Sequence, residues 1–217
     1  YWAHNSDADF LDPAAIDEDH ACRIRTRNAA ILLDLAHCDA GVSPTWFQRS
    51  RFPAVFRDKI AVLHDGIDTG YFQPAPGAKL VLPGLDLSGA GEILTYATRG
   101  MEPYRGFPQF MRAAALLQQR RPKLHVVVVG ADRVVYGKHL PEGQSYKQQL
   151  LAELPTLDLS RLHFTGPLPY DQYLRVLQAS TVHVNLTVPF VLSWSLLESM
   201  ATGCALVRLD VANDQPT

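Results

Sequence analysis

From residue 93 onward, short apolar runs alternate with segments whose apolar residues recur every three or four positions. The short runs predict strands, because they are rich in β-branched residues, and the other spacing predicts amphipathic helices. We expect strands at 93–98, 124–129, 161–165, 181–186 and 205–209, with a helix between each successive pair. The run at 124–129 is too apolar for a strand with a solvated face, so both of its faces should be buried. This alternation predicts an α/β fold with a doubly wound parallel sheet.

Residues 1–72 have a different pattern, with short strands expected at 39–42 and 60–64 and helices around them. Two strands cannot close a hydrophobic core of their own. We therefore expect 1–72 to be the tail of another α/β domain whose earlier part is missing. The segment 73–91 is rich in Pro and Gly and is expected to be a linker or an extended loop. Residues 92–217 would form the second domain without its C-terminal end, so the chain is expected to be a fragment truncated at both ends.

The composition excludes several classes of function. A net charge of −2 with 19% charged residues gives no electrostatic reason to expect nucleic-acid binding, and no apolar run is long enough to span a bilayer. The three cysteines lie far apart and form neither a disulfide framework nor a zinc pattern, which favours a reducing, cytoplasmic setting. The eight histidines are scattered along the sequence and are interpreted as structural. We expect no metal site.

The turn after the strand at 93–98 is a candidate phosphate-binding site. It carries Arg99, Gly100, Arg105 and Gly106 directly before a helix begins. The free N–H groups at a helix N-terminus and the helix dipole attract anions. Guanidinium groups are planar, permanently charged and suited to phosphate oxygens. The pattern predicts an anion pocket at the carboxyl edge of the sheet.

A second candidate segment runs from 188 to 203 and follows the strand at 181–186. Ser193 or Ser195 is able to cap the helix that follows, which would make a second anion site. Glu198 lies about one turn into this apolar helix, where a carboxylate needs a partner. The alternative interpretation is that Glu198 is a solvated helix residue.

These two segments resemble the donor half of a family 4 (group 1) glycosyltransferase of the GT-B fold, as do 39–45, 64–68 and 164–170. The resemblance covers about residues 20–217. It implies two Rossmann-like domains with the active site in the cleft between them, and it places 64–68 at the crossover between the domains. The implied reaction transfers a sugar from a nucleotide-diphosphate sugar to a glycan or lipid-linked acceptor, with retention of configuration. The donor is a substrate, and no cofactor is expected. A peripheral contact with the inner face of the membrane, through the missing domain, stays open.

The resemblance also assigns site residues by position. Arg99 and Arg105 would neutralise the diphosphate and stabilise it as it leaves, so they are the candidate catalytic residues. With these groups in place, the reaction would require no divalent metal. Glu198 matches the second glutamate of the family's Glu-x7-Glu motif, which contacts the ribose. The candidate donor-binding positions are Gly100, Gly106, Gly130, Gly166, Leu168, Ser193, Trp194 and Glu198.

The first glutamate of that motif is replaced by Phe190. A phenyl ring neither accepts a hydrogen bond nor carries charge, so a second hypothesis stays open. In it, the chain is a degenerate member of the family that binds a nucleotide or a partner without transferring sugar. A nucleotide-sugar epimerase on the same fold is a third hypothesis, but the apolar stretch at 188–192 supplies none of the acidic groups that it would need.

Overall fold

The computed structural model describes residues 18–137, 139–188 and 192–208. These residues belong to two compact units. Residues 18–66, 188 and 192–193 form the small unit, and residues 67–137, 139–187 and 194–208 form the large unit. None of the helices in the described parts of the chain is both long and apolar enough to cross a membrane.

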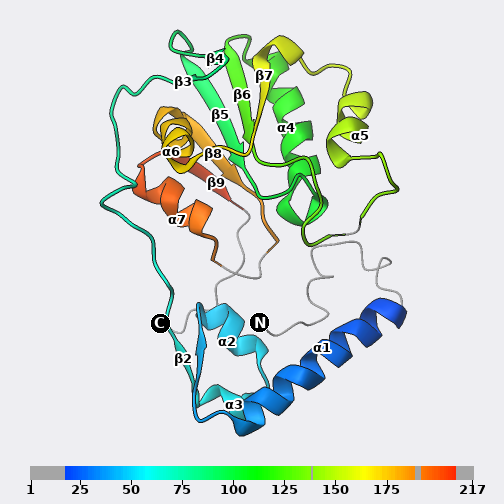
Figure 1. Cartoon of the computed structure of the whole chain (residues 1–217). Coiled ribbons are helices and arrows are strands. Elements are labelled where there is room, and N and C mark those ends of the chain that lie inside the picture. Colours follow the sequence, from blue (N-terminus) through cyan, green and yellow to red (C-terminus); the bar gives the residue numbers. More distant parts are fainter. Residues whose placement is uncertain (1–17, 138, 189–191, 209–217) are drawn as a thin grey trace. The chain divides into compact units, whose positions relative to one another are not determined.

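The large unit contains the alternating strands and helices that the apolar pattern predicts (Figure 1). Each of the five predicted strands is found within one residue of its expected bounds. The elements are β3 (Val81–Leu82), β4 (Leu85–Asp86), β5 (Glu92–Ala97), η3 (Pro103–Arg105), α4 (Phe107–Arg120), β6 (Leu124–Val129), α5 (Tyr146–Glu153), η4 (Leu159–Arg161), β7 (Leu162–Gly166), α6 (Tyr170–Ala179), β8 (Val182–Asn185), α7 (Trp194–Ala201) and β9 (Ala205–Arg208).

The five longer strands form one parallel sheet in the order β7-β6-β5-β8-β9. The chain starts at the centre with β5, adds β6 and β7 on one side, and then crosses to add β8 and β9 on the other. This order confirms the doubly wound sheet. It also places the reversal of strand order between β5 and β8, where such folds bind their ligands at the carboxyl ends of the strands.

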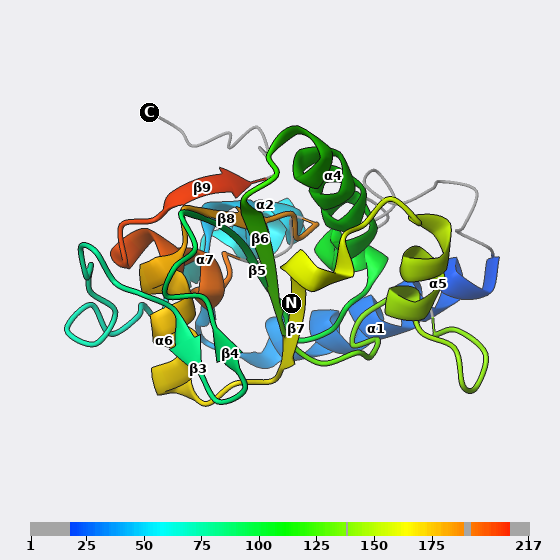
Figure 2. The ribbon, with the colours of Figure 1, turned by 90° about the horizontal axis from the view of Figure 1, so that it is seen from above.

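Helices cover both faces of this sheet. In Figure 2, α4 and α5 lie on one side of the strands, and α6 and α7 lie on the other. Along β6, Val126 and Val128 pack into the core under α4 and α5, whereas Val127 and Val129 pack into the core on the α6 side. All four of these valines are buried, which confirms that this strand has no solvated face.

The segment 73–91, which the sequence predicts as a linker or an extended loop, contains a small antiparallel hairpin made of β3 and β4. Leu80, Leu82 and Leu87 are buried and pack into the core on the α6 side of the sheet. The hairpin is therefore part of the large unit. Its strands have two residues each, which is too short to show a period-two pattern in the sequence.

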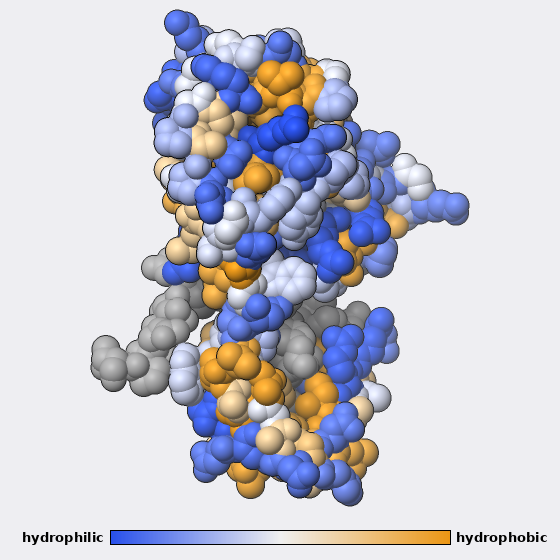
Figure 3. Space-filling view, turned by 60° about the vertical axis from the view of Figure 1, so that its left-hand side comes forward, coloured by the Kyte–Doolittle hydropathy of each residue, from blue (hydrophilic) through white to orange (hydrophobic). Residues whose placement is uncertain are grey.

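The small unit contains α1 (Glu18–His37), β1 (Gly41–Ser43), α2 (Trp46–Arg51), α3 (Ala54–Arg57) and β2 (Ile60–Val62), and β1 pairs with β2 in parallel. Its buried core consists of Leu35, Phe52 and Ile60. Such a core is small, as expected for two strands. Figure 3 shows apolar residues gathered on the surface of this unit, where Val42, Val55 and Leu63 are more than half exposed.

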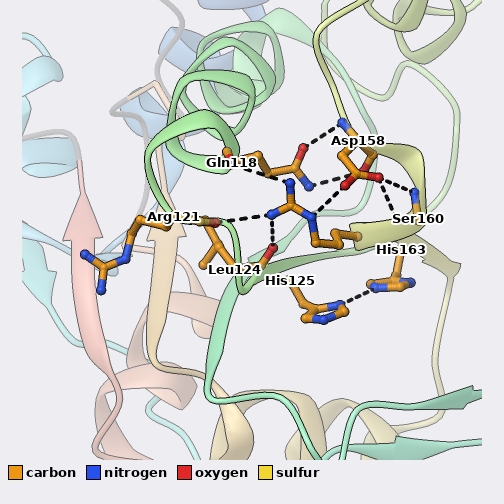
Figure 4. Close-up of polar contacts among 8 residues, drawn as sticks. Gln118, Arg121, Leu124, His125, Asp158, Ser160 and His163 are labelled. Carbon is orange, nitrogen blue, oxygen red and sulfur yellow. Dashed lines mark hydrogen bonds and ion pairs between the residues drawn. The ribbon is translucent and has the colours of Figure 1, made fainter.

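Residues 158–163 make polar contacts with neighbouring elements at the amino ends of the strands of the large sheet (Figure 4). The Arg161 guanidinium donates to the carbonyl oxygens of Arg121 and Leu124, at 3.2 Å each, and to the Asp158 carboxylate at 2.7 Å. Hydrogen bonds from Ser160 and Arg161 lower the pKa of Asp158 to about 2. These contacts join the end of α4, the start of β6 and the start of β7.

Two histidines of neighbouring strands form a pair that the sequence does not reveal, because they are 38 residues apart. His125 Nδ1 and His163 Nε2 are 3.0 Å apart, and the rings point toward one another in Figure 4. One ring must donate and the other accept, so a second proton would set two N–H groups against each other. Burial, and then the neighbouring His125, lower the pKa of His163.

His183 on β8 is fully buried, and its Nδ1 lies 2.8 Å from Thr95 Oγ1. Burial lowers the pKa of His183 from 6.5 to about 4. At a pH between these two pKa values, His183 is protonated in the unfolded chain and neutral in the folded chain. Acid therefore favours the unfolded chain.

We expect the free energy of unfolding to fall as the pH is lowered from 7 to 5, with His183 contributing up to about 1.4 kcal/mol per pH unit. Urea denaturation at a series of pH values measures this slope. The matched variant is His183→Gln, which cannot take up a proton in this range and should show a shallower slope. An unchanged slope in His183→Gln would contradict the assignment.

Candidate functional site

The two candidate segments follow neighbouring strands of the large sheet. The turn 98–106 leaves the carboxyl end of β5, and Leu186 and Thr187 follow the carboxyl end of β8. β5 and β8 pair in the sheet, with Thr95 opposite His183. The Arg105 Nη1 donates to Thr187 Oγ1 at 3.3 Å, which joins the turn to the segment after β8. The structure thus brings the turn 98–106 together with Thr187, the residue before the second predicted segment, at the point where the strand order reverses.

Arg105 is held in a fixed position within the turn. It is the last residue of η3, which begins with Pro103, and only 9% of its surface is exposed. Its carbonyl oxygen accepts a hydrogen bond from the Tyr96 hydroxyl at 2.8 Å. Its guanidinium carbon lies 4.9 Å from the centroid of the Tyr136 ring, a distance at which a cation and an aromatic face attract each other. Arg105 is therefore a largely buried cation at the edge of the sheet.

Arg99 differs from Arg105 in being exposed. Its carbonyl oxygen accepts from Arg133 Nε at 3.4 Å. Arg133 comes from the loop after β6 and is a third arginine beside this turn, and the sequence analysis missed it. It belongs to no recognisable motif, and only the packing of the two loops brings it next to Arg99.

The glycines of the turn are explained by close approach of backbone. A Cβ on Gly100 would lie 2.6 Å from the Arg133 carbonyl oxygen, in the loop after β6. A Cβ on Gly106 would overlap Leu186 after β8, and the φ of Gly106 is +71°. A Cβ on Gly130 would overlap the Thr98 carbonyl oxygen. The donor-binding role predicted for these three glycines stays a prediction, and each has a structural reason beside it.

Gly166 and Leu168 lie at the end of β7 and just beyond it. Gly166 has a φ of +70°, and its carbonyl oxygen accepts from the Gly130 N–H at 3.0 Å. The Leu168 side chain packs against the core on the α6 side. This loop, in which Gly166 and Leu168 are predicted donor-binding positions, thus has a defined position, and its contact with the donor stays a prediction.

Glu198 is buried, with 4% of its surface exposed. The Tyr170 hydroxyl donates to its Oε1 at 2.9 Å. Burial raises the pKa of Glu198, while the hydrogen bond from Tyr170 and the nearby Tyr173 hydroxyl act in the opposite direction. The interpretation of Glu198 as a solvated helix residue is wrong, and the expected partner is a tyrosine from the start of α6.

The helix that carries Glu198 begins after Ser193, the first of the two cap positions that the sequence offers. α7 starts at Trp194, directly after Ser193, and the Trp194 side chain is 56% exposed. The donor contacts assigned to Ser193 and Trp194 stay predictions. Phe190 lies outside the described residues.

Glu102 is a further residue of the turn that the sequence analysis missed. It is completely buried, and its carboxylate accepts the backbone N–H groups of Val135, Tyr136 and Gly137 at 2.7 to 3.2 Å. The only signal in the sequence is an acidic residue in a turn that otherwise carries basic and apolar side chains. Within the described residues, no group of three or more His, Cys, Asp or Glu side chains is arranged to hold a metal ion.

The chain matches two family sequence profiles. Residues 1–72 match the profile described as Glycosyl transferase family 4 group, and residues 91–216 match the profile described as Glycosyl transferases group 1. The second match covers more than half of the chain. The chain therefore belongs to the group 1 glycosyltransferase family.

The chain is similar to D-inositol 3-phosphate glycosyltransferases of two Streptomyces species. It is 29% identical over 157 residues to that of Streptomyces scabiei, which covers 71% of this chain and 34% of the relative. It is 29% identical over 158 residues to that of Streptomyces avermitilis, which covers 71% of this chain and 33% of the relative. The chain thus matches about a third of the length of these curated relatives.

Two solved structures confirm the predicted GT-B type fold. The HepE protein of Anabaena, in complex with UDP and glucose, gives a TM-score of 0.64 at 16% identity, over 92% of this chain and 50% of that protein. Sucrose-phosphate synthase of Thermosynechococcus elongatus gives a TM-score of 0.65 at 16% identity, over 96% of this chain and 48% of that protein. At such low identity these likenesses show the fold alone.

The packing at Gly106 predicts that alanine there destabilises the protein more than alanine at two glycines outside the turn, Gly89 and Gly143. Gly89→Ala should be neutral, because a Cβ there meets nothing and the backbone is ordinary. Gly143→Ala should cost about 1 kcal/mol of unfolding free energy, because its φ is positive but the space is open. Gly106→Ala should cost about 3 kcal/mol, because strain and overlap add. Chemical denaturation measures all three, and equal losses at Gly106 and Gly143 would contradict the packing argument.

Proposed function

We propose that this chain is the donor-binding portion of a glycosyltransferase that uses a nucleotide-diphosphate sugar. The observation that carries the proposal is the position of Arg105, a largely buried cation between the ends of β5 and β8. The family membership of the chain supports it. The HepE structures in complex with UDP and with UDP-glucose support a nucleotide sugar as the substrate.

Leaving-group stabilisation is the chemistry that this site suits. Breaking the anomeric C–O bond places growing negative charge on the diphosphate. Arg105 and Arg99 would meet that charge together with the N-terminus of α4, which begins directly after Gly106. Because Arg105 is shielded from water, its attraction for phosphate is screened less than that of a surface arginine. Removing one such group typically costs about 3 kcal/mol of transition-state stabilisation.

The finer features of the reaction are part of the same proposal. The arginines and helix N-termini supply the positive charge that a divalent metal supplies in other transferases, so we propose metal-independent transfer. Retention of configuration and a glycan or lipid-linked acceptor follow from the family resemblance. We place the reaction in the cytoplasm, in polysaccharide biosynthesis, with a peripheral contact at the inner face of the membrane.

The proposal assigns ribose recognition to Glu198. Tyr170 occupies Oε1, and a carboxylate has further acceptor capacity on its other oxygen. A buried carboxylate suits a ribose hydroxyl, because a hydrogen bond to a charged group is worth more than a neutral one.

A non-catalytic, nucleotide-binding member of the family is the alternative. Phe190, at the sequence position of the first glutamate in the family's motif, is the observation that favours it. Both functions require the same diphosphate site. Transfer of sugar by the complete protein separates them.

Calorimetry should show that one of UDP, GDP and ADP binds this chain with saturation. Arg105→Ala should weaken that binding by about tenfold to a hundredfold, as expected for the loss of a charged hydrogen-bonding group. The matched control is Arg112→Ala, because Arg112 is an exposed arginine paired with Glu153 at 2.8 Å. An equal effect of the two substitutions, or no binding of any nucleotide, would contradict the proposal.

Glu198→Gln should lower the preference of the chain for ribonucleotides. We expect the bound ribonucleoside diphosphate to exceed its 2′-deoxy or 3′-deoxy form by about tenfold in affinity, and this ratio should fall toward one in Glu198→Gln. Titration of the three nucleotides into both proteins measures the ratio. Glu153→Gln makes the same chemical change at an exposed site and should leave the ratio unchanged. A ratio that survives in Glu198→Gln would remove the ribose assignment.

A further inference from the structure

The buried Glu102 carboxylate organises the loop after β6. Its Oε2 accepts the N–H groups of Val135, Tyr136 and Gly137 at 3.2, 3.0 and 2.7 Å, and its Oε1 also accepts from Tyr136 at 3.2 Å. A buried carboxylate is unfavourable unless hydrogen bonds replace its lost hydration. Three successive backbone donors supply that replacement. In return, the carboxylate fixes the backbone of 135–137 against the turn 98–106.

Glycines allow close contact between the loop after β6 and the turn 98–106 at both ends of this loop segment. A Cβ on Gly137 would lie 3.1 Å from Glu102 Oε2, so a larger residue there would crowd the carboxylate. At the other end, Gly100 lets the Arg133 carbonyl and the Val135 side chain come within 2.6 and 2.8 Å of the position that its Cβ would occupy. We call residues 133–137 the clamped loop. Its position relative to the turn is set at Gly100 and at Glu102.

The clamped loop carries the aromatic ring that faces Arg105. The Tyr136 ring centroid lies 4.9 Å from the Arg105 guanidinium carbon and 6.0 Å from the Tyr104 ring centroid. A ring over one face of a guanidinium limits how that group rotates, and it leaves the N–H groups at the edge to meet oxygen atoms. One such N–H already donates to Thr187. The direction of the Arg105 fork therefore depends on where Tyr136 is held.

We propose that Glu102 is a positioning residue of the diphosphate site, which fixes the clamped loop and so holds Tyr136 against Arg105. This inference rests on the proposed function, because diphosphate is the ligand assigned to Arg105. The carboxylate has no assigned contact with the donor. Its effect on binding is transmitted through the backbone N–H groups of 135–137 and the Tyr136 ring.

Binding of inorganic pyrophosphate tests the proposal without knowledge of the base. Glu102→Gln should weaken pyrophosphate binding by about tenfold, because the amide loses the charge and turns an N–H group toward backbone donors. Tyr136→Leu should cause a similar loss, and Tyr136→Phe should retain the affinity because it keeps the ring. In the double variant Glu102→Gln with Tyr136→Leu, the loss should not exceed that of the stronger single variant, because both changes break one chain of contacts.

A purely structural role for Glu102 predicts different results. If Glu102 only stabilises the fold, Glu102→Gln should weaken the binding of pyrophosphate and the binding of the free nucleoside by the same factor. Alternatively, the losses of the two single variants should add in the double variant. Either result overturns the proposal. Tyr136 is 48% exposed, so Tyr136→Leu keeps the test informative if Glu102→Gln does not fold. Glu153→Gln, at an exposed ion pair, is the matched carboxylate-to-amide control.

The wild-type protein separates the two levels of the argument. If it binds neither pyrophosphate nor any nucleoside diphosphate, the proposed function fails and this inference fails with it. If it binds them and Glu102→Gln binds them equally well, only the inference fails. Hydrogen exchange of the amides at 135–137 should also quicken in Glu102→Gln, and unchanged exchange would count against the clamp.

Discussion

The backbone of the turn between β5 and α4 packs directly against the loops on both sides of it. The candidate site depends on this close packing. Gly100 admits the loop after β6, and Gly106 admits the segment after β8. A side chain at Gly100 would push the turn away from the loop after β6, and one at Gly106 would push it away from the segment after β8. Arg105, between these glycines, consequently has a backbone position that its neighbours determine. A preorganised cation of this kind does not need to reorganise when charge develops on a ligand.

Three charged residues of the turn are placed in different ways. Arg99 is exposed, whereas Arg105 and Glu102 are buried. The Glu102 carboxylate is satisfied by backbone N–H groups of the clamped loop. The Arg105 guanidinium, by contrast, is held by an aromatic face and a hydroxyl. In the proposed function, an acid satisfied by backbone donors does not have to compete with phosphate for the arginine, and this explains why an acidic residue is compatible with an anion site.

The sequence predicts the strands and helices of the large unit well, because short apolar runs and amphipathic spacing are local properties. A doubly wound fold also places the loops after its parallel strands along one edge of the sheet. Which loops are neighbours is known only from the structure, where 98–106 contacts Leu186 and Thr187. What the sequence could not supply is contact between side chains and distant backbone. The hydrogen bonds from the clamped loop to Glu102, and the contact between His125 and His163, are of this long-range kind. The hairpin of β3 and β4 was missed for another reason, since two-residue strands carry no periodic signal.

The central claim is that the diphosphate of the donor lies at Arg105, at the ends of β5 and β8. The most direct test is a crystal structure of the protein with the nucleoside diphosphate that it binds. The account predicts that the phosphates contact the Arg105 guanidinium at the N-terminus of α4, and that the ribose contacts Glu198. A nucleotide bound elsewhere on the protein, or one whose phosphates point away from Arg105, would contradict it.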